Sequence, residues 1–114
     1  MCGIVAGCGS EDLINLTLKG LLAVEYRGYD SAGISTLNNQ ILYTEKVAGK
    51  VKSLIKKTQT LKGSITLAHT RWATHGPVST LNAHPHVSHD ALSIVHNGII
   101  ENYTDLKIFL SKSG

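Results

Sequence analysis

Apolar residues recur along this chain of 114 residues with spacings that predict its helices and strands. The first apolar run, residues 2–8, predicts a short strand. A helix should follow, because Ser10 is a typical helix cap and the apolar residues of 13–24 share one helical face. Gly28 predicts the end of this helix.

The middle of the chain predicts a hairpin and a short helix. Residues 31–37 and 40–46 have strand patterns, and Asn38-Asn39 between them is typical of a tight turn. Apolar positions in 51–55 give a short helix whose lysines face water.

A further strand and an irregular segment come next. Residues 64–69 alternate, with Ile65, Leu67 and His69 on one side, which predicts a half-buried strand. Residues 70–90 show no period and contain both prolines and four of the six histidines. A long irregular segment within a small domain is usually functional or disordered.

The C-terminal part predicts one more strand, at residues 92–96, and a last helix capped by Asn102. The residues of this helix expected to face inward are Tyr103, Leu106, Phe109 and Leu110.

Composition and charge narrow the classes of function. Hydrophobic residues make up 42% and charged residues 17%, which suits one soluble globular domain. The net charge of +3 comes with only two arginines and one tryptophan, so a nucleic-acid-binding surface is not expected. The chain contains no run of 18 apolar residues, so no membrane span is expected. Cys2 and Cys8 are too far apart on one strand for a disulfide, which favours a reducing, cytoplasmic location.

The first candidate for chemistry is Cys2, directly after Met1. If Met1 is removed, one residue carries both a thiol and a free α-amine. An α-amine can serve as the general base for a neighbouring nucleophile. The unperturbed pKa values, about 8.5 for a thiol and roughly 7.7–8.0 for an α-amine, allow proton exchange near neutral pH.

Two further groups would support attack of a thiol on an amide, one by stabilising the oxyanion and one by binding the substrate. Asn97-Gly98 at a strand end could form an oxyanion hole from a side-chain amide and a backbone N–H. Arg71 could bind a carboxylate through two parallel hydrogen bonds. Each also has a plainer explanation, since Asn-Gly is common in turns and a lone arginine often forms a surface ion pair.

Taken together, five motifs resemble those of the class II glutamine amidotransferases. They are residues 1–5 (MCGIV), 25–33 (EYRGYDSAG), 69–76 (HTRWATHG), 82–86 (NAHPH) and 96–102 (HNGIIEN). The resemblance implies an α+β fold, the N-terminal nucleophile hydrolase αββα four-layer sandwich, of which this chain is the N-terminal portion. It implies hydrolysis of the side-chain amide of L-glutamine, without a cofactor.

The resemblance also assigns roles to individual residues. Cys2 attacks the amide and forms a γ-glutamyl thioester, while Asn97 and the Gly98 N–H hold the oxyanion. Arg71 binds the glutamine α-carboxylate. The same pocket is lined by Thr74 and His75, and Trp72 lies on a mobile loop that closes over the substrate.

The motifs are most similar to the branch of the family that uses the ammonia on fructose 6-phosphate, in a separate isomerase domain of a homodimeric protein. That isomerase domain, and the end of the glutaminase domain, would follow Gly114. Residues 1–114 are therefore expected to be an incomplete type 2 glutamine amidotransferase domain. Weak or no glutamine turnover by this chain alone is expected, with a tendency to dimerise or aggregate through open sheet edges.

Three alternatives remain at this stage. The fold could be an inactive scaffold, or a self-processing hydrolase, although only Met1 precedes Cys2. A metal-binding module could use the histidines at positions 75, 84, 86, 89 and 96, although Pro85 separates two of them.

Some polar residues are expected to be structural. His69 and His96 should be packed within the fold, and Cys8 should be an inert core thiol. Tyr26 and Arg27 should brace the pocket without touching substrate.

Overall fold

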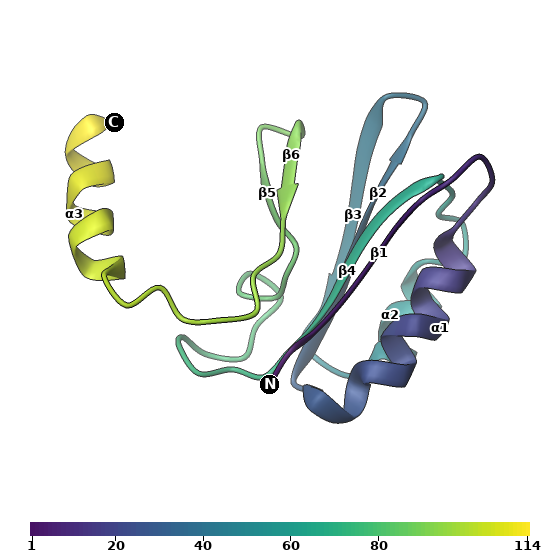
Figure 1. Ribbon diagram of the computed structural model, residues 1–114, viewed down its shortest axis with the longest axis horizontal. Helices are drawn as coiled ribbons and strands as arrows, with labels where there is room; N and C mark the ends of the chain where they lie inside the picture. The colour runs from purple at the N-terminus through teal and green to yellow at the C-terminus, as the bar shows by residue number, and fades with distance from the viewer.

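A computed structural model describes all 114 residues and places four strands in one antiparallel sheet (Figure 1). The strands are β1 (Gly3–Cys8), β2 (Ser31–Asn38), β3 (Ile41–Val47) and β4 (Ile65–Arg71). Their order across the sheet is β1-β4-β2-β3. All four strands were predicted, β1 from an apolar run, β2 and β3 from strand patterns on either side of a turn, and β4 from alternation, and their positions are confirmed.

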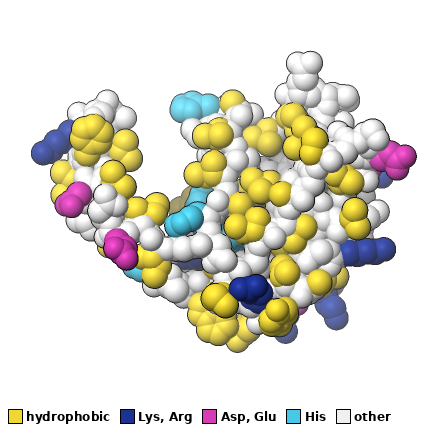
Figure 2. All heavy atoms as spheres, in the orientation of Figure 1, with side chains coloured by type: hydrophobic (Ala, Val, Ile, Leu, Met, Phe, Trp, Pro, Cys, Tyr) yellow, Lys and Arg dark blue, Asp and Glu magenta, His cyan; other side chains and the backbone are white.

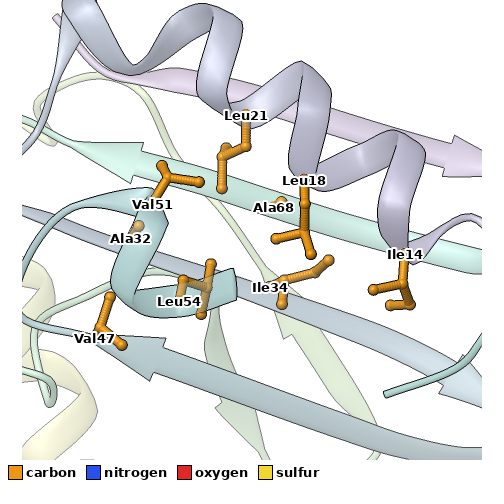
Figure 3. Packing of buried hydrophobic residues seen from close by; sticks show 9 residues of the cluster. All are labelled: Ile14, Leu18, Leu21, Ala32, Ile34, Val47, Val51, Leu54 and Ala68. Atoms are coloured by element: carbon orange, nitrogen blue, oxygen red, sulfur yellow. The ribbon is translucent and has the colours of Figure 1, made fainter. Parts of the chain in front are cut away.

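Two helices, α1 (Ile14–Val24) and α2 (Val51–Lys57), cover one face of this sheet (Figure 1). Their apolar residues meet those of the strands in a single core (Figure 3). Full burial of one aliphatic side chain of this kind stabilises a fold by about 1.5–3 kcal/mol. The core residues are Ile14, Leu18, Leu21, Ala32, Ile34, Val47, Val51, Leu54 and Ala68.

The opposite face of the sheet carries a small hairpin of β5 (His86–Ser88) and β6 (Leu92–Ile94). The Ser93 hydroxyl donates to Ser35 Oγ over 2.7 Å and so joins this hairpin to β2. Helix α3 (Tyr103–Ser113) lies beyond the hairpin and stands apart from the rest of the molecule (Figure 1). The layers run helix, sheet, hairpin, helix, as in an αββα sandwich of which the second half is thin.

The strand register brings three strand ends together at one end of the sheet: the start of β1, the start of β2 and the end of β4. Gly3 at the start of β1 pairs with Thr70 near the end of β4, and Ser31 at the start of β2 pairs with Arg71. Cys2, which precedes β1, therefore lies beside the end of β4, and the turn before β2 lies on the other side.

Gly28 follows a short 3₁₀ turn, η1 (Glu25–Arg27), so the predicted end of the helix is confirmed in position. Its backbone is extended, with φ −169°, and so does not use the left-handed conformation typical of a helix-ending glycine. The requirement is space, because a Cβ here would lie 2.8 Å from the Arg71 carbonyl carbon.

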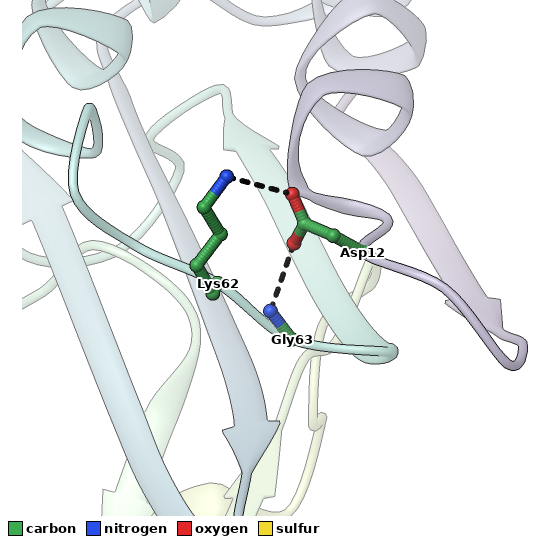
Figure 4. Close-up of polar contacts among 3 residues, drawn as sticks. All are labelled: Asp12, Lys62 and Gly63. Carbon is green, nitrogen blue, oxygen red and sulfur yellow. Dashed lines mark hydrogen bonds and ion pairs between the residues drawn. The ribbon is translucent and has the colours of Figure 1, made fainter.

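The predicted cap at Ser10 is wrong, since α1 begins at Ile14 and has no side-chain cap. The preceding residues instead pair with the segment that leads into β4. Asp12 Oδ1 accepts the Gly63 N–H at 2.9 Å, and Asp12 Oδ2 lies 3.6 Å from Lys62 Nζ (Figure 4). Because Lys62 is exposed, this ion pair contributes at most about 1 kcal/mol.

The predicted burial of Cys8 is wrong, and the way the helices cover the sheet gives the reason. The helices cover the side of β4 that carries Thr66, Ala68 and Thr70, all of them buried. Ile65 and its register partner Cys8 lie on the other face and are exposed, so Cys8 is not a core thiol. The polar Thr66 is accepted on the covered side because its hydroxyl bonds Thr17 Oγ1 at 2.6 Å.

The inward face predicted for α3 is also wrong in this structure. Leu106, Phe109 and Leu110 are 41%, 65% and 61% exposed. The apolar pattern is present, but no helix or strand of the chain packs over these side chains (Figure 1). No helix of the chain has the length and apolar character that crossing a membrane requires.

The N-terminus of α2 depends on a carboxylate from another element. Glu25 Oε2 accepts the Val51 N–H at 2.6 Å, and α2 has no side-chain cap of its own. We expect Glu25→Ala to lower the free energy of unfolding by about 1–2 kcal/mol, because a buried helix-end N–H loses its partner. Urea unfolding measures this. The exposed Glu11→Ala is the matched control and should change the value by less than about 0.5 kcal/mol.

Candidate active site

A cavity of about 490 Å³ opens at the end of the sheet where Cys2 and the end of β4 meet. Figure 2 shows a hollow between α3 and the body of the molecule, with histidine side chains exposed inside it. Six of the seven residues predicted from the sequence to form the site line this cavity. They are Cys2, Arg71, Trp72, Thr74, His75 and Gly98.

Cys2 is half-buried at the edge of the cavity. Its sulfur accepts the backbone N–H of Trp72 at 3.3 Å. This contact fixes the thiol against the first residue after β4, so the nucleophile candidate and the loop after β4 are held together.

Asn97 is the seventh predicted residue, and it contacts Cys2 directly. Its Nδ2 donates to the Cys2 carbonyl oxygen at 3.0 Å. Gly98 follows it in the cavity wall, and a Cβ there would lie 2.8 Å from the His96 ring. The Asn-Gly segment therefore lies beside the candidate nucleophile rather than in a remote turn.

Arg71 is 8% exposed, and no carboxylate pairs with it. Its Nη1 donates to the Pro77 carbonyl at 3.2 Å, and its Nη2 donates to the His75 carbonyl. Two of its five N–H groups thus brace the loop of residues 72–77, and the others make no hydrogen bond within the chain. A buried guanidinium with unused donors beside a cavity suits an anionic ligand.

Asp30 anchors the same loop from the other side. Its Oδ2 accepts the Ala73 N–H, and its backbone N–H donates to the Arg71 carbonyl at 3.2 Å. Ser31 Oγ donates to Asp30 Oδ1 at 2.8 Å. Asp30 lies in the motif of residues 25–33 but was not singled out from the sequence, because its partners lie about forty residues away.

The remaining loop residues make fewer contacts. Trp72 is 48% exposed and meets Tyr29 edge to face at 5.6 Å. Thr74 Oγ1 lies 3.2 Å from His75 Nδ1, and His75 meets Tyr103 at the start of α3. The two flanking residues predicted to brace the pocket, Tyr26 and Arg27, do not line it.

A group of histidines forms the floor of the cavity. His69 is fully buried and stacks on His84 with ring centroids 4.3 Å apart, and His84 meets His86 at 4.4 Å. Burial lowers the pKa of His69 to about 4 and, with the neighbouring imidazoles, that of His84 to about 3. Burial and the charges of Lys46 and Arg71 lower the pKa of His86. These rings are therefore neutral at physiological pH.

Two predictions about histidines meet different outcomes. His69 is packed, as predicted, but the side chain of His96 is exposed and only its backbone is held. No group of three or more His, Cys, Asp or Glu residues is arranged to hold a metal ion. His69 and His84 stack face to face, and His86 meets His84 edge to face, so these rings pack on one another and the geometry does not support the metal-binding alternative.

The low pKa values predict an acid-dependent loss of stability. Between about pH 6.5 and pH 4 the unfolded chain binds about two more protons, on His69 and His84, than the folded chain does. The free energy of unfolding should therefore fall as the pH drops through this range, with no contribution from these rings above it. Urea unfolding at several pH values measures the slope. His84→Phe should flatten it, and the exposed control His89→Asn should not.

The chain is similar to known proteins both in sequence and in fold. The chain is 50% identical to glutamine–fructose-6-phosphate aminotransferase [isomerizing] of Buchnera aphidicola subsp. Acyrthosiphon pisum, over all of this chain and 19% of the relative. It is 47% identical to the enzyme of that name from Acinetobacter baylyi, with the same coverage. The chain thus spans about a fifth of the length of these curated relatives. No family model matches it.

Solved structures of amidotransferases share the fold. Glutamine phosphoribosylpyrophosphate amidotransferase from B. subtilis superimposes with a TM-score of 0.85 and 27% identity, over all of this chain and 25% of that one. The allosteric regulatory enzyme of purine biosynthesis gives 0.88 and 28%, over all of this chain and 26% of that one. By sequence the chain matches the N-terminal fifth of glutamine–fructose-6-phosphate aminotransferases, and its fold resembles the N-terminal nucleophile domains of glutamine amidotransferases.

Proposed function

We propose that this chain forms the nucleophile half of a glutaminase site, at which the longer protein hydrolyses the side-chain amide of L-glutamine through Cys2. One observation carries the proposal. Cys2, Arg71 and the Asn97-Gly98 segment, which are far apart in sequence, meet around one cavity. A thiol nucleophile, a cation for a carboxylate and donors for an oxyanion are the groups that this reaction needs.

The reaction proceeds in two halves. The Cys2 sulfur attacks the amide carbon, and the resulting oxyanion is stabilised by the Asn97 side chain and the Gly98 N–H. The carbon–nitrogen bond then breaks, and ammonia leaves with the proton that the thiol gave up. Water attacks the γ-glutamyl thioester, which releases glutamate and restores the thiol.

The base for the first proton transfer is the α-amine of Cys2, once Met1 has been removed. This amine lies on the same residue as the sulfur, so it can take the thiol proton and return it to the leaving nitrogen through water. In the present structure Asn97 Nδ2 contacts the Cys2 carbonyl, and this contact keeps the first residue of the mature chain beside the oxyanion segment.

Recognition of glutamine rests on the loop after β4. The unused donors of Arg71 bind the α-carboxylate, and Thr74 and His75 line the same pocket. Trp72 is half exposed at the rim and closes over the substrate. Such a cover excludes bulk water while the thioester forms, which strengthens the electrostatic contacts that hold the substrate and the oxyanion.

For the whole protein we infer a longer chain. The relatives of which this chain spans 19% are named for transfer to fructose 6-phosphate. Residues 1–114 then form the N-terminal part of a type 2 glutamine amidotransferase domain. An isomerase domain beyond it uses the ammonia to convert fructose 6-phosphate to glucosamine 6-phosphate, in a cytoplasmic homodimer.

The experiment is intact mass after incubation with a glutamine-mimicking electrophile, with and without excess L-glutamine. We expect loss of Met1 and one adduct on Cys2, which glutamine suppresses. Retained Met1, or an adduct that glutamine does not suppress, would contradict the proposal and favour the inactive scaffold.

A further inference from the structure

Two imidazoles, the buried His69 and the half-buried His84, hold the backbone N–H and C=O of His96, the residue that precedes the Asn97-Gly98 segment. His84 Nδ1 accepts the backbone N–H of His96 at 3.2 Å. His69 Nε2 lies 3.2 Å from the His96 carbonyl oxygen and donates to it. The donor and the acceptor of His96 are therefore both satisfied by side chains rather than by a strand, because β6 ends at Ile94.

These contacts fix the proton on each ring. Because His84 Nδ1 accepts, it carries a lone pair, and its proton is on Nε2. Because His69 donates from Nε2, its Nδ1 carries no proton. His69 Nδ1 is the one buried side-chain polar atom of the chain without a hydrogen-bond partner, so in this tautomer the unpartnered atom is an acceptor and no buried N–H is left without one. A protonated His84 would present an N–H to an N–H and lose the contact.

The loop that carries His84 packs on three residues that are neighbours across the sheet. In the register, His69 of β4 pairs with Gly33 of β2, which pairs with Lys46 of β3. A Cβ at Gly33 would overlap the His84 carbonyl oxygen, so the missing side chain provides the space for this loop. Lys46 Nζ donates to the carbonyls of Ala83 at 2.8 Å and Leu81 at 3.2 Å.

We propose that His69 and His84 are positioning residues that clamp the backbone of His96 on both sides of its Cα and thereby hold Asn97 and Gly98 at the distance from Cys2 that the oxyanion needs. The proposal rests on the proposed glutaminase function. Its basis is that one imidazole binds the backbone N–H of His96 and the other binds its backbone C=O, while the two rings stack on one another. Small displacements of oxyanion donors are costly, since removing one donor reduces kcat by about 10²–10³-fold.

The test compares three variants of the protein that carries this chain. His84→Phe keeps a flat ring for stacking but removes the acceptor, and should reduce kcat for glutamine hydrolysis by about 10-fold or more with little change in KM. His84→Asn retains an acceptor and should recover most of kcat. His89→Asn, on the exposed turn of the β5–β6 hairpin, is the control and should match the wild type.

An unchanged kcat in His84→Phe, or a His84→Asn as slow as His84→Phe, would overturn the proposal. A second measurement needs neither a variant nor activity. In isotope-labelled wild-type protein, a nitrogen-to-nitrogen scalar coupling between the His96 amide and His84 Nδ1 reports the hydrogen bond directly. Its absence at neutral pH would overturn the clamp. Its presence in a protein without glutaminase activity would uphold the contact while contradicting the proposed function.

Discussion

A Cys2→Ala protein should release neither ammonia nor glutamate and should take up no adduct from a glutamine-mimicking electrophile. No other thiol lines the cavity, and the backbone donor at Trp72 would face a methyl group. Loss of an enzyme's nucleophile commonly reduces kcat on the order of 10⁴-fold or more. Ammonia release and intact mass measure the two effects.

The second cysteine provides a matched control for this prediction. Cys8 is exposed at the far end of β1, away from the cavity, so Cys8→Ala should keep wild-type turnover and glutamine protection. An adduct that persists in Cys2→Ala and is lost in Cys8→Ala would refute the assignment of Cys2. Circular dichroism should show the same fold in both variants, because neither side chain belongs to the core.

The local pattern of the sequence was sufficient to predict most helices and strands. Strands β1 to β4 and helix α2 lie close to their expected positions, because alternation and helical spacing depend only on neighbours along the chain. The hairpin turn lies one residue later than expected, at Asn39 and Gln40. Both adopt positive φ, which suits the twist of a two-residue turn.

Which face becomes buried could not be predicted from the same pattern. The alternation of β4 fits either side of a sheet, and the helices cover the side with Thr66 and Ala68. Likewise, α3 has an apolar stripe that includes Leu106 and Phe109, yet no element of this chain covers it. Such outcomes depend on packing between distant segments.

The residues of the site also fall into two groups, those that the sequence could predict and those that it could not. Cys2, Arg71 and Asn97 could be singled out because their chemistry is visible in the residue type and in a family motif. The clamp of His69 and His84 on the His96 backbone could not, because it joins a strand, a loop and a second loop that no local pattern connects. A packed His69 was predicted, but its stacking on His84 and the tautomers of both rings are properties of the tertiary structure.

The second prediction with a large effect concerns Arg71. The substitution Arg71→Lys should raise the KM for glutamine by about 10- to 100-fold. Charge-assisted hydrogen bonds of this kind contribute about 1.5–3 kcal/mol, and lysine cannot form the same two parallel bonds. Arg27→Lys, at a residue outside the cavity, is the control and should leave KM unchanged. Steady-state ammonia release at varied glutamine concentration measures both.

Arg71 also braces the loop through the His75 and Pro77 carbonyls, so a raised KM alone does not separate the two roles. A glutamine analogue without the α-carboxylate, 4-aminobutanamide, separates them. If Arg71 binds the carboxylate, the wild type should already be poor with this analogue, and Arg71→Lys should cost little more. If the substitution lowers turnover of both substrates equally, Arg71 acts by holding the loop of residues 72–77, and the carboxylate is bound elsewhere.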